Sequence, residues 1–195
     1  MYILSLIRKT VNYLYLKYYG VETGFGYVEL NGFPLIFKHK TARIIIGKGV
    51  TLNSTCQSNF AGINHRVILA APTETSILTI GEGSGISGST IVAVKEVIIE
   101  DGVGLGVNSC IYDTDFHPID AVARRKQKSI KDATAKTVCI KEGALIGANA
   151  IVLKGVMVGR FTVIGAGSVV SRDIPDDVIA AGNPAEVIKK INVLR

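Results

Sequence analysis

The sequence predicts an all-β chain folded as a parallel β-helix, with an amphipathic helix before it, a long inserted loop and a short helix at the end. The first observation is a six-residue period, because aliphatic residues recur at every sixth position from Ile140 to Val170. The second is that glycine often follows the aliphatic residue, as after Ile146, Val158 and Ile164. The third is that a period of six fits neither the 3.6-residue α-helix nor simple strand alternation.

A hexad of this kind forms one short strand and a tight turn, with its first residue pointing inward. Three hexads complete one triangular coil, and stacked coils bury columns of Ile, Val and Leu. Glycine and asparagine supply the positive φ angles that the corners need. The earlier hexads are Ile46 and Leu52, then Ile80, Ile86 and Val92, and then Ile99, Leu105 and Ile111.

Residues 1–41 precede the coil, which we assign to residues 42–191, and they have a different pattern. Apolar residues at Leu4, Ile7, Val11, Leu14 and Tyr18 are spaced three and four apart, which predicts an amphipathic helix. We expect this stripe to pack against the end or side of the coil. A second interpretation is peripheral contact with an anionic membrane, since the segment carries five tyrosines and three cations.

Residues 112–138 interrupt the coil and form its long loop. Ile111 and Ile140 are 29 residues apart, which is not a multiple of six, so the coil resumes in a new frame. The loop begins with the acid-rich stretch IYDTDFHPID and continues as a basic segment. Loops of this length in compact domains are often functional. A second insertion, roughly residues 53–79, contains His65 and no evident chemistry.

The end of the sequence predicts a short helix. Asn183-Pro184 breaks the chain, and the following AEVIKKINVL has helical spacing at Val187, Ile188 and Ile191. Residues 192–195 are expected to form a tail.

Composition narrows the classes of partner and compartment. The chain has 195 residues and a net charge of +6, which suits one domain and an anionic partner or ligand. No run of five basic residues occurs, so nucleic acid is not expected as a partner.

Cys56, Cys110 and Cys139 lack CxxC spacing, which indicates free thiols in a reducing compartment. No signal peptide is visible, so we expect a cytoplasmic protein, with membrane contact at the inner face as the second interpretation.

The hexads IGEGSG, IEDGVG, IKEGAL, IGANAI and IGAGSV, with the closing run VIGAGSVVSRDIPDDVIAAGNPAEVIKKI, resemble the hexapeptide-repeat acyltransferases. The similar branch contains galactoside, maltose and polysaccharide O-acetyltransferases, and the resemblance covers about residues 42–191. It implies a left-handed coil, a homotrimer, acetyl-CoA as co-substrate without a metal, and a saccharide acceptor.

The resemblance also implies the site residues. The histidine before Pro118, His117, matches the family's general base, a role that suits imidazole near neutral pH. We expect Asp115 to orient it, with Asp113 either sharing that role or binding acceptor hydroxyls. Coenzyme A contacts are expected at Gly106, Ala148, Ala166, Ser171, Arg172 and Lys189, with the Gly106 N–H receiving the oxyanion. Acceptor contacts are expected at Ser87, Asn108 and Asp113.

The leading hypothesis is therefore O-acetylation of a saccharide in surface polysaccharide or glycan biosynthesis. N-acetylation of a nucleotide-linked amino sugar or an antibiotic is the alternative. A zinc carbonic anhydrase of the same fold would need three histidines at one interface, whereas His39, His65 and His117 are scattered. A non-catalytic scaffold is the remaining alternative.

Overall fold

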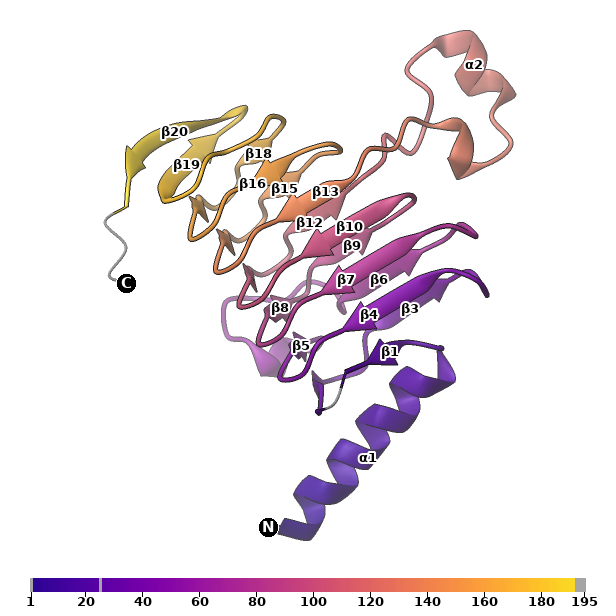
Figure 1. Cartoon of the computed structure of the whole chain (residues 1–195), viewed down its shortest axis with the longest axis vertical. Helices are drawn as coiled ribbons and strands as arrows, with labels where there is room; N and C mark the ends of the chain where they lie inside the picture. The colour runs from indigo at the N-terminus through magenta and orange to yellow at the C-terminus, as the bar shows by residue number, and fades with distance from the viewer. Residues whose placement is uncertain (1, 25, 192–195) are drawn as a thin grey trace.

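Three β-sheets form the walls of a coil that the chain winds repeatedly (Figure 1). The structure is a computed structural model that describes residues 2–24 and 26–191. The tail expected at residues 192–195 lies outside these ranges. Successive strands pass from sheet A to sheet B to sheet C, and each pairs in parallel with strands of the coils before and after it.

The described residues form sheets of six, eight and six strands. Sheet A holds β1 (Glu22–Thr23), β4 (Arg43–Ile46), β7 (Ile77–Ile80), β10 (Glu96–Ile99), β13 (Val138–Ile140) and β16 (Met157–Val158). Sheet B holds β2 (Glu29–Asn31), β5 (Thr51–Asn53), β8 (Gly85–Ser87), β11 (Gly104–Leu105), β14 (Leu145–Ile146), β17 (Val163–Ile164), β19 (Val178–Gly182) and β20 (Ala185–Lys190). Sheet C holds β3 (Leu35–Lys38), β6 (Ile68–Ala71), β9 (Thr90–Val92), β12 (Cys110–Tyr112), β15 (Ile151–Val152) and β18 (Val169–Val170).

The core is a set of three aliphatic columns, one for each sheet. In sheet A the strand register stacks Ile46, Ile80, Ile99, Ile140 and Val158, and none of these side chains is more than 1% exposed. The matching columns are Leu52, Ile86, Leu105, Ile146 and Ile164 in sheet B, and Leu69, Ile91, Ile111, Val152 and Val170 in sheet C. Each fully buried side chain contributes about 1.5–3 kcal/mol. The predicted inward positions are confirmed except at Val92, because Ile91 fills the sheet C column and Val92 belongs to a separate small cluster with Ala70 and Val94.

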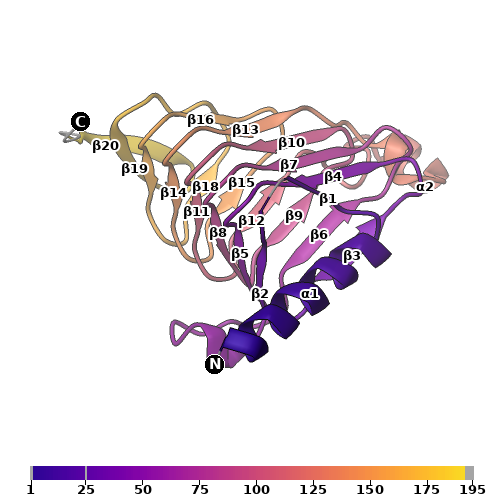
Figure 2. The same ribbon diagram turned by 60° about the horizontal axis from the view of Figure 1, so that its bottom comes forward.

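Helix α1 (Tyr2–Tyr18) confirms the predicted helix and lies under the first coil (Figure 2). It contacts the coil through Asn12 and Leu16, which are 3% and 1% exposed. The Asn12 Nδ2 donates to a backbone carbonyl of the coil at 3.2 Å. The apolar stripe that we expected to pack there faces solvent, with exposed fractions from 44% at Val11 to 84% at Tyr18. That expectation is wrong because the opposite, partly polar face of the helix makes the contacts with the coil.

No helix within residues 2–24 and 26–191 is long and apolar enough to cross a membrane.

Two loops leave the coil at different corners. The longer one, residues 113–137, connects β12 to β13 and contains α2 (Ala121–Lys126) and the 3₁₀ turn η2 (Ile130–Asp132). The shorter one, residues 54–67, connects β5 to β6 and contains η1 (Cys56–Ser58). The second insertion is thus shorter than the predicted residues 53–79, because β6 and most of β7 fall inside that range.

The predicted C-terminal helix is wrong. Residues 185–190 form β20, which pairs antiparallel with β19 across a turn at Asn183-Pro184. Strand β19 continues sheet B beside β17 and leaves an open edge, and β20 covers that edge. Val187 and Ile188 are 48% and 63% exposed, so the apolar spacing that suggested a helix does not mark a buried face.

Candidate active site

His117 lies on the loop between sheets C and A, with an exposed ring that is held on one side. Its Nδ1 is 2.7 Å from the Oε1 of Gln127. The Nε2 of Gln127 donates to the carbonyl oxygens of Phe116 at 2.8 Å and Ser129 at 3.0 Å, which fixes the orientation of the amide. Since Oε1 can only accept, His117 carries its proton on Nδ1. Its Nε2 makes no hydrogen bond to the described residues.

The backbone before His117 is fixed by the base of the loop. Phe116 adopts a positive φ of 62°, and its N–H donates to Thr114 Oγ1 at 3.1 Å. The ring of Phe116 packs edge-on against Tyr112, at 5.0 Å between centroids, over a small apolar cluster on sheet C. The N–H of His117 donates to the Asp115 carbonyl at 2.7 Å. The loop therefore presents the imidazole from a rigid turn.

Asp113 is fully buried and binds the corner before β10. Its Oδ1 accepts from Val94 N at 2.8 Å, and its Oδ2 accepts from Lys95 N at 2.6 Å and Glu96 N at 2.8 Å. Burial raises the pKa of the Asp113 carboxyl above its ordinary value, and the backbone donors oppose that rise. Its oxygens are used inside the fold, so the expectations that Asp113 orients His117 or binds acceptor hydroxyls are not met by this geometry.

Asp115 makes no hydrogen bond to the imidazole either. Its Oδ1 accepts from Lys154 Nζ at 2.7 Å, an ion pair that ties the loop to the coil at the end of β15. The side chain that orients His117 is instead Gln127, which sequence reasoning missed. No spacing rule distinguishes one glutamine among the polar residues of this loop, so only the folded loop could identify it.

The corner between sheets B and C carries a second group of predicted residues. The strand register aligns Ser87 with Gly106, and Gly106 with Gly147 and then Gly165 on successive coils. A Cβ at Gly147 would lie 2.5 Å from Ala166 N, so glycine is needed for the close approach of the coils. This corner presents a strip of backbone along the coil axis.

Of the backbone N–H groups expected to face the ligand on this strip, one is already hydrogen-bonded within the coil and two are not. The Gly106 N–H already donates to Ile146 O at 2.8 Å, so the expectation that it receives the oxyanion is wrong. The N–H groups of Ala148 and Ala166 have no acceptor among the described residues. These two predicted coenzyme contacts are therefore available to a ligand.

Ser87 and Asn108 hold the shorter loop on this corner. The Ser87 Oγ accepts from Asn53 Nδ2 at 3.0 Å and from Asn59 Nδ2 at 3.2 Å. The Asn108 Oδ1 accepts from Asn64 N at 2.9 Å, and its Nδ2 donates to a loop carbonyl at 3.0 Å. Ser87 and Asn108, the two residues predicted to contact the saccharide acceptor, thus already make hydrogen bonds within this chain.

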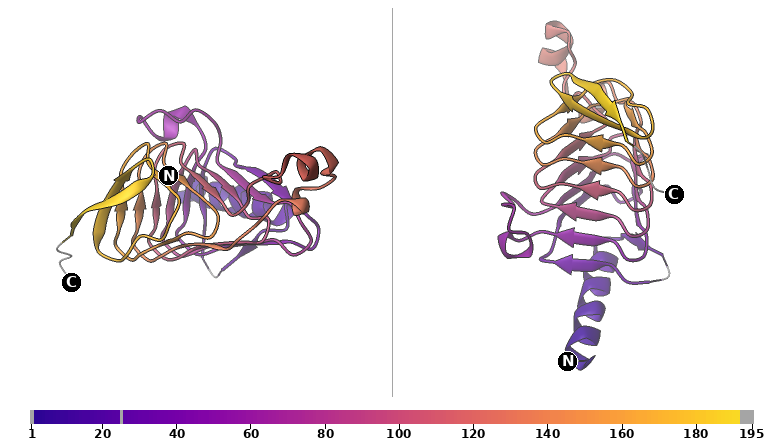
Figure 3. Two further views of the ribbon diagram at one scale, coloured as in Figure 1. Left: turned by 90° about the horizontal axis from the view of Figure 1, so that it is seen from above. Right: turned by 90° about the vertical axis from the view of Figure 1, so that its left-hand side faces the viewer.

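The remaining predicted residues lie elsewhere. Ser171 and Arg172 directly follow β18, on the same corner as Lys154 and the His117 loop. Lys189 lies on β20 and is exposed. One chain therefore divides the predicted site between two corners: the loop with α2 lies at the opposite edge of the coil from β8, β11 and β14 (Figures 2 and 3).

The three histidines do not meet. His39 Nδ1 contacts Thr41 Oγ1 at 3.0 Å, His65 Nδ1 contacts Arg66 O at 2.8 Å, and His117 contacts Gln127. Within the described ranges no three His, Cys, Asp or Glu side chains gather into a metal-binding group. All three cysteines are free.

Known proteins share this coil. Residues 140–172 match the family described as "Bacterial transferase hexapeptide (six repeats)". A galactoside O-acetyltransferase of Lactococcus lactis is 40% identical over 113 residues, which are 56% of this chain and 52% of that protein. The chain thus spans about half the length of the curated relatives it matches.

Two solved structures extend the similarity. The polySia-specific acetyltransferase NeuO has a TM-score of 0.68 and 27% identity, over 86% of this chain and 71% of that one. A hexapeptide-repeat acetyltransferase from Vibrio cholerae, complexed with acetyl coenzyme A, has a TM-score of 0.54 and 26% identity, over 60% and 61%. The coil is a hexapeptide-repeat, left-handed parallel β-helix, which confirms the predicted fold class.

Proposed function

We propose that this chain, which carries the bacterial transferase hexapeptide repeat and is similar to galactoside O-acetyltransferases, is an acetyl-CoA-dependent O-acetyltransferase with a saccharide acceptor. The observation that carries the proposal is the fixed state of His117. The Oε1 of Gln127 accepts a hydrogen bond from the Nδ1–H of His117. The Nε2 is therefore the ring nitrogen left without a partner among the described residues, and it is presented from a rigid turn. A neutral imidazole held in this way is suited to general-base catalysis.

The chemistry assigns one proton path to His117. Its Nε2 accepts the proton of an acceptor hydroxyl while the hydroxyl oxygen bonds to the acetyl carbonyl carbon. The acetyl group is supplied by acetyl-CoA as a thioester, and the carbon–sulfur bond breaks as the ester forms. The imidazolium then returns the proton to the departing sulfur. Gln127 Oε1 holds the ring through Nδ1–H in both states, because that nitrogen is protonated throughout.

The corner between sheets B and C fits the pantetheine part of coenzyme A. Its glycines leave the backbone uncovered, and the N–H groups of Ala148 and Ala166 lack protein acceptors. An extended chain of amides can accept from such donors. Ser171, Arg172 and Lys189 are exposed toward the C-terminal end of the coil, where two cations suit the phosphates. We assign these residues to the coenzyme, whereas the backbone groups of Gly106 are used within the coil.

The division of the site over two corners supports a homotrimer. His117 and Arg172 lie on one corner, whereas Ala148 and Ala166 lie on another, so a complete site needs two copies of the chain. The loop also exposes Ile119 and Val122 on and beside α2, at 81% and 58%. Packing the loop of one copy against the next would bury these side chains and bring His117 toward the backbone strip.

The similar proteins and the charge of the loop indicate the acceptor class. One similar protein is named for galactosides and another for polysialic acid, which supports acetylation in polysaccharide or glycan biosynthesis. Three free thiols suit a cytoplasmic enzyme. The exposed cations Arg125, Lys126 and Lys128 at the end of α2 favour an anionic acceptor, and this feature keeps N-acetylation of a nucleotide-linked amino sugar as the second candidate.

The test is acetyl transfer from isotope-labelled acetyl-CoA to a panel of simple glycosides, nucleotide amino sugars and lipid-linked oligosaccharides, read by mass spectrometry. We expect a labelled saccharide ester, which mild alkali cleaves, whereas an amide would survive and identify the second candidate. Binding of acetyl-CoA without any product would show that none of these saccharides is the acceptor. Failure to bind acetyl-CoA at all would contradict the enzyme assignment.

A further inference from the structure

Helix α1 presents an apolar face that none of the described residues covers. Its exposed side chains are Leu4, Leu6, Ile7, Val11, Leu14 and Tyr18, each between 44% and 84% exposed. Contiguous exposed apolar surface on this scale marks an interaction site rather than ordinary surface. We call this surface, with the end of the coil beside α1, the basal face.

The orientation of α1 is fixed, so the exposure of this face is built into the fold. Leu16 is buried under the first coil, and Asn12 Nδ2 donates to Val28 O. Arg8 forms an ion pair with Glu29 of β2. These contacts all come from the side of the helix opposite Ile7 and Leu14. The apolar stripe therefore points away from the coil.

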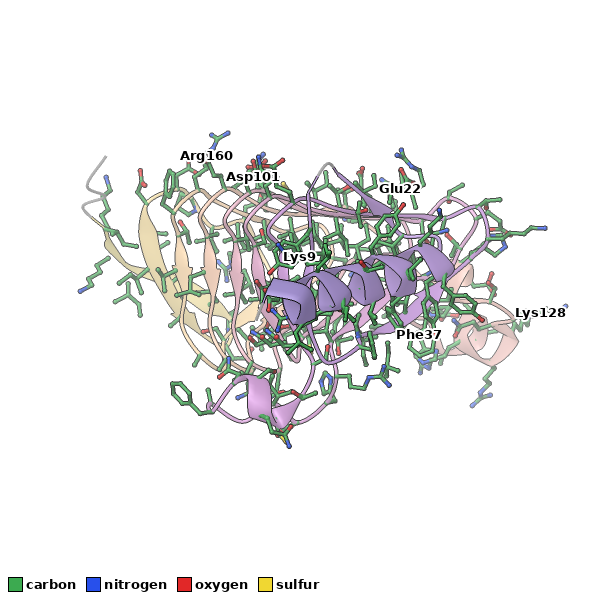
Figure 4. All side chains as sticks on the ribbon, turned by 90° about the horizontal axis from the view of Figure 1, so that it is seen from below. Lys9, Glu22, Phe37, Asp101, Lys128 and Arg160 are labelled. Carbon is green, nitrogen blue, oxygen red and sulfur yellow. The ribbon has the colours of Figure 1, made fainter. Side chains whose placement is uncertain are left out.

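Positive charge is concentrated at the same end. Residues 1–50 contain seven Lys and Arg against two Glu, a net charge of +5, whereas the whole chain carries +6. Helix α1 contains no acidic residue. The two acids, Glu22 and Glu29, are each paired with an arginine. In the view of this end, Lys9 projects from α1, and Glu22 and Phe37 lie on opposite sides of the helix (Figure 4).

Aromatic side chains surround the last turns of the helix. Tyr15 stacks on Phe33 at 4.5 Å between ring centroids, and Tyr19 packs edge-on against Tyr18 at 5.2 Å. Phe37 on the edge strand β3 is 55% exposed. Aromatic rings with a polar tip are enriched at the boundary between lipid headgroups and acyl chains.

We propose that the basal face docks on an anionic lipid bilayer, with α1 lying in the plane of the interface. An apolar face combined with cations and tyrosines is the composition of interfacial helices. The apolar residues would enter the boundary region, and Lys17 would contact the headgroups. This inference is independent of acetyl transfer, although it would place the enzyme beside lipid-linked acceptors.

A second copy of the chain is a weaker occupant for this face. The stripe from Leu4 to Tyr18 has the spacing of a coiled-coil seam. In coiled coils the cations beside the seam pair with acidic side chains of the other helix. A second copy of α1 has no acidic side chain to offer. Leu6 and Tyr13, at 57% and 51% exposed, also lie outside that narrow seam. A broad apolar surface that adjoins net positive charge matches a bilayer better.

Sedimentation of the full chain with vesicles tests the proposal. We expect binding to vesicles of equal parts phosphatidylglycerol and phosphatidylcholine, little binding to pure phosphatidylcholine, and weaker binding at high salt. The double variant Ile7→Gln/Leu14→Gln should bind at least about tenfold more weakly. Lys17→Gln should weaken binding roughly fivefold.

The matched control is Val187→Gln/Ile188→Gln, which removes two equally exposed apolar residues at the other end of the coil. It should bind vesicles like the wild type. Circular dichroism and acetyl transfer should be unchanged in both double variants, so that loss of binding is not loss of folding. Absence of wild-type binding, or equal binding by the Ile7→Gln/Leu14→Gln variant, would overturn the proposal. If that variant instead lowers the oligomer mass while the wild type ignores vesicles, the face joins copies of the chain.

Discussion

The Nδ1 of His117 and the Oε1 of Gln127 are 2.7 Å apart across the base of a loop that carries α2 between them. Both hydrogens of the Gln127 amide are donated to backbone carbonyls, so its oxygen is left to face the imidazole. A neutral amide, and not a carboxylate, thus selects the tautomer of the proposed base.

Gln127→Leu should lower the rate of acetyl transfer by about tenfold to a hundredfold, because the imidazole loses its orientation. Gln127→Glu keeps an acceptor for the Nδ1–H but sets its second oxygen against the carbonyls of Phe116 and Ser129, so it should recover only part of the rate. In that variant the acidic limb of the pH–rate profile should move to higher pH, since the added carboxylate stabilises the imidazolium ion. A merely structural role for Gln127 would leave the shape of the profile unchanged in Gln127→Glu.

Asp113→Asn should destabilise the fold by about 3 kcal/mol, measured by urea unfolding. The substitution replaces a carboxylate oxygen with an NH₂ group that faces backbone donors at Val94, Lys95 and Glu96. Asp120→Asn is the matched control. Asp120 caps α2 by accepting from Ala123 N, and asparagine caps equally well, so the change should be ~0.5 kcal/mol or less. Equal effects of the two substitutions would contradict the assignment of Asp113 as a buried clasp.

Gly147→Ala should destabilise the coil by about 1–3 kcal/mol and weaken coenzyme binding, because its Cβ would lie 2.5 Å from Ala166 N. Gly85→Ala is the control, since a Cβ there meets nothing within 4 Å. Thermal unfolding and titration with acetyl-CoA measure the two effects. A Gly147→Ala protein as stable as Gly85→Ala would show that the coils do not approach so closely.

Thiol labelling should separate the cysteines. Cys56 is exposed, whereas Cys139 is half-buried, and burial raises the pKa of the Cys139 thiol above its ordinary value. Because the thiolate is the reactive form, Cys139 should react with iodoacetamide at least roughly tenfold more slowly than Cys56 near pH 8, and its reaction should accelerate only at higher pH. Peptide mass spectrometry measures both rates, and Cys56→Ser should remove the fast phase. Equal rates at Cys56 and Cys139 would contradict this burial.

The coil was predictable from the sequence because one physical rule repeats along it. Each inward position, such as Ile140 or Ile164, must fill the same triangular core, so the period of six survives every interruption. Helix α1 was predictable for a similar reason, but its orientation was not. The stripe from Leu4 to Tyr18 shows that the helix has two faces, and contacts of Asn12 and Leu16 decide which one meets the coil.

The parts that sequence reasoning missed depend on single contacts. Three apolar positions after Pro184 are too few to distinguish a helix from a strand. The segment forms a strand because β19 has an unpaired edge to which it can hydrogen-bond. His117 was identified by its resemblance to a family motif, whereas Asp113 and Asp115 were assigned by proximity in sequence. The folded loop directs those carboxylates to the backbone and to Lys154, and it brings Gln127 to the ring from ten residues away.

The central claim is that His117 is the base of an acetyl transfer, and its most direct test compares two histidine variants. His117→Ala and His65→Ala each remove an exposed imidazole whose Nδ1 is hydrogen-bonded within its own loop. With labelled acetyl-CoA and an acceptor from the panel, His117→Ala should lose at least about a hundredfold in rate, while His65→Ala stays within about twofold. Equal rates for the two variants would contradict the account.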